Sequence, residues 1–264
     1  MDCWILYDRE DLETNRFFAD RLCSSGKELG LNCSVVTTDE IDPYYAPDIV
    51  VSRIRDPDIV TSLEDNGSTV FNGSSVCRVC NDKSLTYGLA RGLGIPFLPY
   101  SIPGGELPKG PPWVVKSCIG HGGTEVFRAD SPEEVDEICR SLEGRKPIIQ
   151  QMASVPGRDL RMYVLGGKVI ASVLRSSDTD FRANFKLGGK AEMVEPPAEA
   201  IGYVRRILPE LRPDFIGVDF VFGDGMVYLN EIEDVVGTRM LYSLTDLDPA
   251  RMYMEYIAHS KISL

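Results

Sequence analysis

Apolar residues form short, uninterrupted runs in the first part of the chain, at residues 3–7, 33–37 and 48–52. Runs of this length predict strands that are buried on both faces of a sheet. Residues 12–30 have apolar residues at helical spacing and glycines near their end, so they predict a helix between the first two strands. We therefore expect a small parallel α/β domain over residues 1–75.

The pattern changes after a loop rich in proline and glycine at residues 103–112. Two apolar runs, 113–117 and 124–128, flank a glycine-rich turn and predict a pair of adjacent strands. Residues 131–143 begin with serine, proline and two glutamates, which are favoured at the start of a helix. We assign these elements to a central subdomain, residues 76–150.

Two predicted hairpins dominate the remainder of the chain, residues 151–264. The first turns at Gly166 and Gly167, and the second turns between Gly223 and Gly225. Glycine pairs between apolar runs are typical of tight hairpin turns and therefore of an antiparallel sheet. The predicted fold class is α/β for the first domain and α+β for the two subdomains that follow.

The charge balance excludes some classes of partner. The chain has 28 basic and 40 acidic residues, a net charge of −12, so we expect no nucleic-acid partner. No apolar run reaches the roughly 18 residues of a membrane span, and the first residues do not resemble a signal peptide. We expect a cytoplasmic protein with reduced thiols, in which Cys77 and Cys80 are buried rather than zinc-bound.

The second hairpin carries three acidic residues. Asp219 lies on its outgoing strand, and Glu231 and Glu233 lie on its returning strand. Strand alternation places these three on one face and Asn230 on the other, where Asn230 should tolerate substitution. Clustered carboxylates suit a hard ion such as Mg²⁺. The alternative is a solvated acidic face, against which the many apolar neighbours argue.

Lys116 lies near the end of the strand predicted at residues 113–117, and a glycine-rich turn follows it. The turn contains Gly120, Gly122 and Gly123, which let backbone N–H groups approach a phosphate, while lysine adds a positive charge. This pattern predicts a phosphate-binding flap, and a plain structural turn is the alternative. A polar loop at residues 178–189 is either a surface loop or a segment that wraps an anionic ligand.

Taken together, the polar motifs resemble those of the ATP-grasp superfamily, and within it the RimK-like glutamate ligases. Seven segments carry the resemblance in the same order along the chain: NDK (81–83), VVKSCIGHGG (114–123), IIQQM (148–152), GRDLR (157–161), DFRANFKLGG (180–189), GVDF (217–220) and NEIEDVVG (230–237). The segment VVSRIRD (50–56) extends the resemblance into the first domain.

The resemblance implies an ATP-grasp fold in which ATP lies between the central and C-terminal subdomains. It implies that Lys83 and Lys116 hold the nucleotide phosphates below a flap containing Gly122 and Gly123. The backbone of the hinge strand at Gln151 and Met152 would read the adenine edge.

Further roles follow from the resemblance. Asp159 would contact the nucleotide. Arg182 and Asn184 would bind the terminal phosphates as catalytic residues.

The metal ligands implied by the resemblance are Asp219, Glu231 and Glu233, which would hold one or two Mg²⁺ ions, with Mn²⁺ as a substitute. Glu233 stands where the family usually has asparagine, and Val236 replaces the proline of a usual Pro-Gly pair. Both departures leave open how many ions bind and how the substrate loop is shaped.

The implied reaction is ATP-dependent ligation of a carboxylate to an amine through an acyl phosphate, with release of ADP and phosphate. The partners would be a small-molecule or peptide carboxylate and an amine co-substrate, and a homo-oligomer is also considered. Two alternatives stay open: a phosphotransferase on the same fold, and a nucleotide-binding regulator without turnover.

Two arginines are candidates for binding the substrate. Arg53 follows a strand of the first domain, at the edge where α/β folds present ligands, and Arg239 lies just beyond the metal hairpin. A guanidinium group can bind a carboxylate through two hydrogen bonds. The alternative is that each forms a structural ion pair, for example with Asp56 or Asp234.

Overall fold

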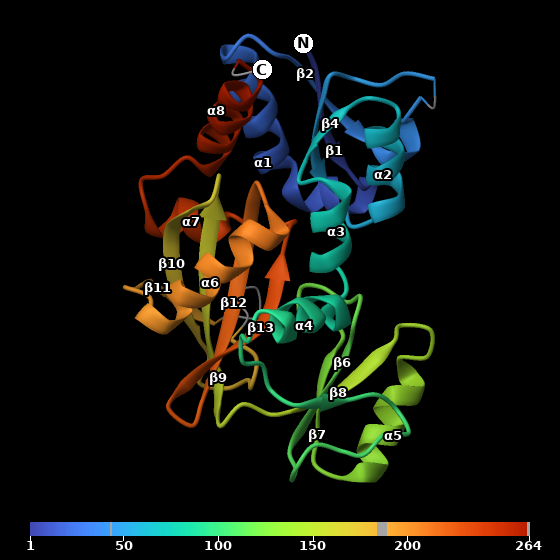
Figure 1. Ribbon diagram of the computed structural model, residues 1–264, viewed down its shortest axis with the longest axis vertical. Helices are drawn as coiled ribbons and strands as arrows, with labels where there is room; N and C mark the ends of the chain where they lie inside the picture. Colours follow the sequence, from blue (N-terminus) through green and yellow to red (C-terminus); the bar gives the residue numbers. More distant parts are fainter. Residues whose placement is uncertain (43, 184–188, 263–264) are drawn as a thin grey trace.

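The computed structural model describes residues 1–42, 44–183 and 189–262, which form three sheets stacked along the long axis of the molecule (Figure 1). The first sheet is entirely parallel, with the strand order β2-β1-β3-β4. Its elements are β1 (Asp2–Tyr7), α1 (Arg9–Glu28), β2 (Asn32–Thr37), the 3-10 helix η1 (Thr38–Glu40), β3 (Ile49–Arg53), α2 (Pro57–Asp65), β4 (Thr69–Phe71) and α3 (Ser74–Cys80).

A four-stranded antiparallel sheet of order β5-β8-β6-β7 forms the opposite end of the molecule. Helix α5 begins as its sequence predicts, because the side chain of Ser131 accepts a hydrogen bond from the backbone N–H of Glu134. The elements of this region are α4 (Lys83–Gly92), β5 (Tyr100–Ser101), β6 (Trp113–Ser117), β7 (Val126–Ala129), α5 (Pro132–Ser141) and β8 (Pro147–Gln151).

The third sheet lies between the other two and has the order β11-β10-β9-β12-β13, with antiparallel pairing throughout. Both expected glycine hairpins are present in it. Its elements are β9 (Val155–Leu165), β10 (Lys168–Ser176), β11 (Lys190–Met193), α6 (Ala198–Leu211), β12 (Phe215–Gly223), β13 (Met226–Glu233) and α7 (Arg239–Leu244).

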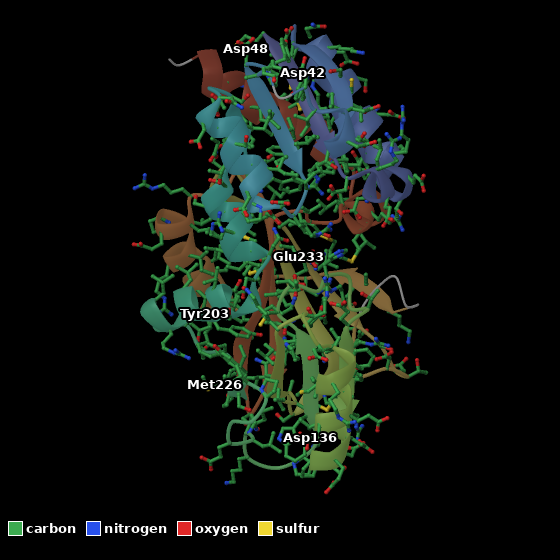
Figure 2. The ribbon with its side chains drawn as sticks, turned by 90° about the vertical axis from the view of Figure 1, so that its right-hand side faces the viewer. Asp42, Asp48, Asp136, Tyr203, Met226 and Glu233 are labelled. Atoms are coloured by element: carbon green, nitrogen blue, oxygen red, sulfur yellow. The ribbon has the colours of Figure 1, made fainter. Side chains whose placement is uncertain are left out.

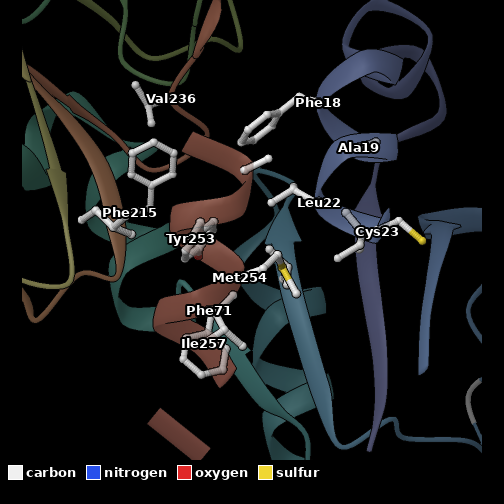
Figure 3. Close-up of a cluster of buried hydrophobic side chains, with 14 of the residues drawn as sticks. Phe18, Ala19, Leu22, Cys23, Phe71, Phe215, Val236, Tyr253, Met254 and Ile257 are labelled. Carbon is white, nitrogen blue, oxygen red and sulfur yellow. The ribbon is translucent and has the colours of Figure 1, made fainter. Parts of the chain in front are cut away.

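The last helix, α8 (Pro249–Ile262), returns to the first sheet and packs beside α1 (Figure 1). Tyr253, Met254 and Ile257 of this helix share a core with α1 and with Phe215 of the third sheet (Figure 3). Close packing requires glycine at position 26, where a Cβ atom would lie 2.3 Å from the Sγ of Cys33. The first and third sheets therefore share one buried core.

All seven cysteines are free, and six of them are buried, including Cys77 and Cys80. None of the helices in the described ranges is both long enough and apolar enough to cross a bilayer. The subdomain limits near residues 75 and 150 stay a prediction.

Candidate active site

A cavity of ≈ 320 Å³ runs from the central sheet, across the third sheet, to the N-terminal half of α1. Every candidate residue from the sequence that the structure describes lines this cavity: Arg53, Lys83, Lys116, Gly122, Gly123, Gln151, Met152, Asp159, Arg182, Asp219, Glu231, Glu233 and Arg239. Asn184 lies outside the described residues. The fold therefore gathers side chains that are far apart in the sequence into one site.

The three acidic residues of the second hairpin form a tight cluster in the middle of the molecule, where Figure 2 labels Glu233. Cross-strand register places Asp219 opposite Glu231, and one carboxylate oxygen from each of the three residues lies within 4.8 Å of the others. Three oxygen donors at this spacing fit a hard divalent cation.

Two buried arginines that the sequence analysis did not select neutralise this cluster. Arg161 on β9 donates to both carboxylate oxygens of Asp219, at 2.7 and 2.6 Å, and its Nη2 lies 2.8 Å from Glu233. Arg175 on β10 donates to Asp219 at 2.7 Å and to both oxygens of Asp159. The pairing of Arg175 with Asp159 across the β9–β10 hairpin was a signal available in the sequence, whereas the contacts of both arginines with Asp219 depend on the sheet order.

The carboxyl groups differ in how easily each becomes charged. Burial alone would raise the pKa of Glu231, but the ammonium groups of Lys83 and Lys116 outweigh it and lower the pKa to about 2. For Glu233, burial together with the charges of Asp219 and Glu231 raises the pKa to about 7, despite Arg161. A bound cation would stabilise the charged form of Glu233.

The two lysines occupy different environments on the central side of the cavity. The Nζ of Lys83 donates to the carbonyl of Gly120 at 2.6 Å and lies 3.2 Å from Glu231. Among the described residues, the Nζ of Lys116 donates to two neutral groups, the hydroxyl of Tyr87 and the Oδ1 of Asn230, both at 3.1 Å.

No carboxylate of the described residues forms an ion pair with Lys116, which is 4% exposed. Burial, followed by the charge of Lys83, lowers the pKa of Lys116 to about 7. A buried ammonium group that no carboxylate of the described residues contacts as an ion pair is a ready site for an anion.

The glycine-rich flap lines the same cavity as this lysine pair. Gly122 and Gly123 have φ angles of 66° and 75°, a region that other residues rarely adopt. Arg182 binds both the flap and Asp180, because its Nη1 donates to the carbonyl of Gly123 at 3.0 Å while its Nε and Nη2 donate to Asp180. Arg182 therefore contacts the flap directly.

The expectation for Asn230 is wrong. The pairing of β12 and β13 skips this residue, because Asp219 pairs with Glu231 whereas Phe220 pairs with Leu229. The resulting β-bulge breaks strand alternation. The side chain of Asn230 therefore reaches Lys116 in the cavity instead of pointing to the opposite face.

At the hinge, the backbone N–H groups of Gln151 and Met152 are already used, since they donate to Pro99 at 2.9 Å and Pro112 at 3.3 Å. Their carbonyl groups are therefore the stronger candidates for recognising a base. Asp159 binds Arg175 through both of its carboxylate oxygens. Burial raises the pKa of Asp159, and the nearby charge of Asp219 raises it further.

Arg53 and Arg239 lie at the far end of the cavity. Arg53 is buried, and its Nη2 and Nη1 donate to the backbone carbonyls of Val236 at 2.7 Å and Asp234 at 3.4 Å. Its guanidinium group therefore holds the loop that follows β13. Arg239 is exposed, and its Nη2 donates to the carbonyl of Thr14 at 3.1 Å.

The alternative to a substrate role was a structural ion pair with Asp56 or Asp234, and neither arginine forms such a pair. An aromatic pair borders the same end of the cavity, where the rings of Phe17 and Tyr242 meet edge to face at 5.3 Å. The substrate role of the two arginines stays a prediction.

Comparison with known proteins agrees with this geometry. Residues 106–257 match the family model described as the RimK-like ATP-grasp domain. The chain belongs to the RimK-like ATP-grasp family. The protein is thereby an ATP-dependent ligase that forms carbon–nitrogen bonds, and ATP with Mg²⁺ is the cofactor pair that ATP-grasp enzymes use.

Curated relatives match most of this RimK-like chain. N-acetylaspartylglutamate synthase A of Mus musculus is 30% identical over 235 residues, which cover 80% of this chain and 61% of the synthase. Glutamate–LysW ligase ArgX of Sulfurisphaera tokodaii is 27% identical and matches over 74% of each chain. An uncharacterised protein of Mycoplasma genitalium is 26% identical and covers 91% of this chain and 86% of its own length.

Solved structures confirm the ATP-grasp fold. D-cycloserine synthetase DcsG superposes with a TM-score of 0.77 over 98% of this chain and 99% of its own, at 17% identity. D-alanine–D-alanine ligase from Bacillus anthracis, complexed with ATP, gives a TM-score of 0.74 over 99% of this chain and 97% of its own, at 14% identity. Identities this low bear on the fold alone.

Proposed function

We propose that the protein joins a substrate carboxylate to an amine through an acyl phosphate. The proposal rests on one observation: a lysine and a cluster of carboxylates line the same cavity. Lys116 offers a buried positive charge without a carboxylate partner in the described residues, and the Asp219–Glu231–Glu233 cluster faces the same space. A phosphate chain bridged to a divalent cation satisfies both groups at once.

The nucleotide would lie under the glycine-rich flap. Lys83 and Lys116 would hold its phosphates, and the flap at Gly122 and Gly123 would cover them. The carbonyl groups of Gln151 and Met152 would accept hydrogen bonds from the amino group of adenine, because their N–H groups are engaged.

Several other side chains would act on the phosphates or the nucleotide. Arg182 already contacts the flap and would reach the terminal phosphates, with Asn184 as its proposed partner. Asp159 lines the same cavity as Arg182 and would contact the nucleotide.

Asp219, Glu231 and Glu233 would bind one or two Mg²⁺ ions, or Mn²⁺ in their place. The ion supplies charge neutralisation for the transferred phosphoryl group. Arg161 and Arg175 hold the carboxylate of Asp219 in place before any ion binds, so this chain orients its ligands in advance. No side chain needs to act as a covalent nucleophile, because positioning and charge carry the chemistry.

The proposed reaction has two steps. A carboxylate oxygen of the substrate attacks the γ-phosphorus of ATP, the bond to the β-γ bridging oxygen breaks, and ADP leaves. The amine nitrogen then attacks the carbonyl carbon of the acyl phosphate. The bond to the phosphate oxygen breaks, the nitrogen loses a proton, and an amide and inorganic phosphate remain.

The acceptor would enter at the end of the cavity near α1. Arg239 and Arg53 are the proposed ligands for its carboxylate, and the exposed Arg239 has the greater freedom to do so. Two relatives are named for products or substrates that contain glutamate, N-acetylaspartylglutamate synthase A and Glutamate–LysW ligase ArgX. An acidic amino acid is therefore the first amine co-substrate to test.

The direct test is to incubate the protein with ATP, Mg²⁺, pooled carboxylic acids and amino acids, and to follow phosphate release and product mass. We expect an amide product, and hydroxylamine in place of the amine should trap the acyl phosphate as a hydroxamate. A stable phosphate ester as the only product would support a phosphotransferase instead. Nucleotide binding without any turnover would support a regulator.

A further inference from the structure

We propose that Tyr87 and Asn230 are positioning residues that hold Lys116 for the nucleotide and tie it to the metal-binding strand. The inference rests on the proposed function, in which Lys116 binds a phosphate. Neither Tyr87 nor Asn230 was expected in the site from the sequence. Their role follows from a hydrogen-bond network that joins the two sheets flanking the cavity.

The hydroxyl group of Tyr87 is the centre of this network. It accepts hydrogen bonds from the Nζ of Lys116 at 3.1 Å and from the Nε2 of Gln150 at 3.2 Å, and it donates to the backbone carbonyl of Asn230 at 2.8 Å. Lys116 and Gln150 belong to the central sheet, whereas Asn230 belongs to β13 of the third sheet. One hydroxyl therefore links three strands from two sheets.

The position of this hydroxyl is fixed by packing. Tyr87 is fully buried on α4, and its ring stacks on Phe97 at 5.0 Å and contacts Tyr100 at 5.2 Å. Gln150 is held as well, because its Nε2 also donates to the carbonyl of Leu98 at 3.0 Å. A rigid ring in a closed pocket restricts where the Nζ of Lys116 can lie.

The β-bulge at Asn230 completes the arrangement. It turns the Oδ1 of Asn230 toward Lys116 and leaves Glu231, the next residue, in the metal cluster. The phosphate-binding lysine and a metal ligand are thereby separated by a single hydrogen-bonded residue. Because the network connects the two sheets, it sets the distance between the ammonium group of Lys116 and the carboxylate of Glu231.

The chemistry of the two acceptors matters too. Both are neutral, so they orient the ammonium group without cancelling its charge. A carboxylate at either position would hold Lys116 equally well but would compete with a phosphate for it. The neutral pair thus leaves the charge of Lys116 available to an anion.

The first test compares Tyr87→Phe with a matched control, Tyr203→Phe, by calorimetric titration with Mg²⁺–ADP. The hydroxyl of Tyr203 contacts Glu199 on α6, away from the cavity. We expect Tyr87→Phe to weaken nucleotide binding by about tenfold or more, since a hydrogen bond to a charged group is lost, and Tyr203→Phe to leave it unchanged. Wild-type affinity in folded Tyr87→Phe would overturn the inference.

The second test uses Asn230→Asp, which keeps the shape of the side chain and adds a charge beside Lys116. If Asn230 had only a structural role, this change would strengthen its contact with Lys116 and leave the affinity for Mg²⁺–ADP unaltered. We expect the opposite readout: thermal stability is retained while affinity for Mg²⁺–ADP falls by about tenfold. Unchanged affinity would contradict the inference, whereas absence of nucleotide binding by the unaltered protein would overturn the proposed function itself.

Discussion

The two walls of the cavity differ in how their charged side chains are paired. On the wall formed by the third sheet, each acidic residue has a basic partner: Asp219 binds Arg161 and Arg175, Glu233 binds Arg161, and Glu231 lies beside Lys83. On the wall formed by the central sheet, the hydrogen-bond partners of Lys116 within the described part of the chain are neutral groups.

This difference indicates what each wall is built to accept. The acidic wall orders its carboxylates before a ligand arrives and keeps Glu231 charged, which preorganises the cluster for a cation. The lysine wall instead keeps a buried charge without a carboxylate partner in the described residues, at a cost that lowers the pKa of Lys116 to about 7. An anion that reaches Lys116 removes that cost, so the folded protein favours anion binding there.

The largest effect is expected from breaking the acidic wall at Glu231. Glu231→Gln keeps the shape and removes the charge that faces both lysines and the proposed metal. Metal-dependent turnover should fall by about 10²-fold or more, the range for losing a transition-state charge contact, while the fold persists. Steady-state phosphate release with Mg²⁺ measures this effect, and near-normal turnover in the soluble variant would remove Glu231 from the metal site.

A smaller effect is expected from the lysine wall. Lys116→Met keeps the apolar stem and removes the ammonium group, so nucleotide binding should weaken by about 1.5–3 kcal/mol. Calorimetry with ADP measures the loss directly. Lys168→Met, on a lysine outside the cavity, is the matched control and should leave affinity unchanged. Equal affinities for all three proteins would exclude Lys116 from the nucleotide site.

The two walls should also respond to pH in opposite directions. Glu233, with a pKa raised to about 7, must lose its proton to bind a cation, so affinity for Mg²⁺ should fall as the pH drops below 7. Lys116, with a pKa lowered to about 7, must hold its proton to bind an anion, so affinity for ADP should fall as the pH rises above 7. Each slope should approach about tenfold per pH unit, the limit for one proton.

Separate titrations of Mg²⁺ and of metal-free ADP between pH 6 and 8, roughly the range around both pKa values, would measure these slopes. Glu233→Gln should flatten the first slope, and Lys116→Met should flatten the second. Parallel slopes for the two ligands would show that the walls are not distinguished by these two groups.

The smallest effect is expected at the acceptor end. Arg239→Lys keeps the charge but loses the planar fork that binds a carboxylate through two hydrogen bonds. It should raise the KM for the acid substrate by several-fold, roughly the value of one charge-assisted hydrogen bond, and leave the KM for ATP unchanged. Equal changes in both constants would argue against direct substrate contact.

The acidic hairpin and the glycine-rich flap could be predicted from local patterns, whereas the roles of Lys83, Gln151 and Arg182 were expected only from the family resemblance. The hairpin between β12 and β13 brings Asp219 and Glu231 together as predicted, although the two residues lie opposite each other because of the bulge at Asn230. The strand before Lys116 and the glycine turn after it also appear where the apolar pattern placed them. Local patterns of this kind are readable without knowledge of the rest of the fold.

The parts that could not be read depend on contacts between distant segments. Strand alternation fails at Asn230 because a bulge interrupts it, and no residue type in the segment marks the bulge. Arg161 and Arg175 became visible only when the order β10-β9-β12 placed them beside Asp219. The packing of α8 against α1 likewise joins the two ends of the chain, which local periodicity does not encode.

The central claim is that one cavity binds a nucleotide and a divalent cation between its two walls. The most direct measurement is a calorimetric titration of the protein with ADP, with and without Mg²⁺, repeated with Glu231→Gln. The account predicts that Mg²⁺ strengthens ADP binding to the unaltered protein and has little effect on the variant. Binding that ignores Mg²⁺ in both proteins, or that Mg²⁺ strengthens equally in both, would contradict it.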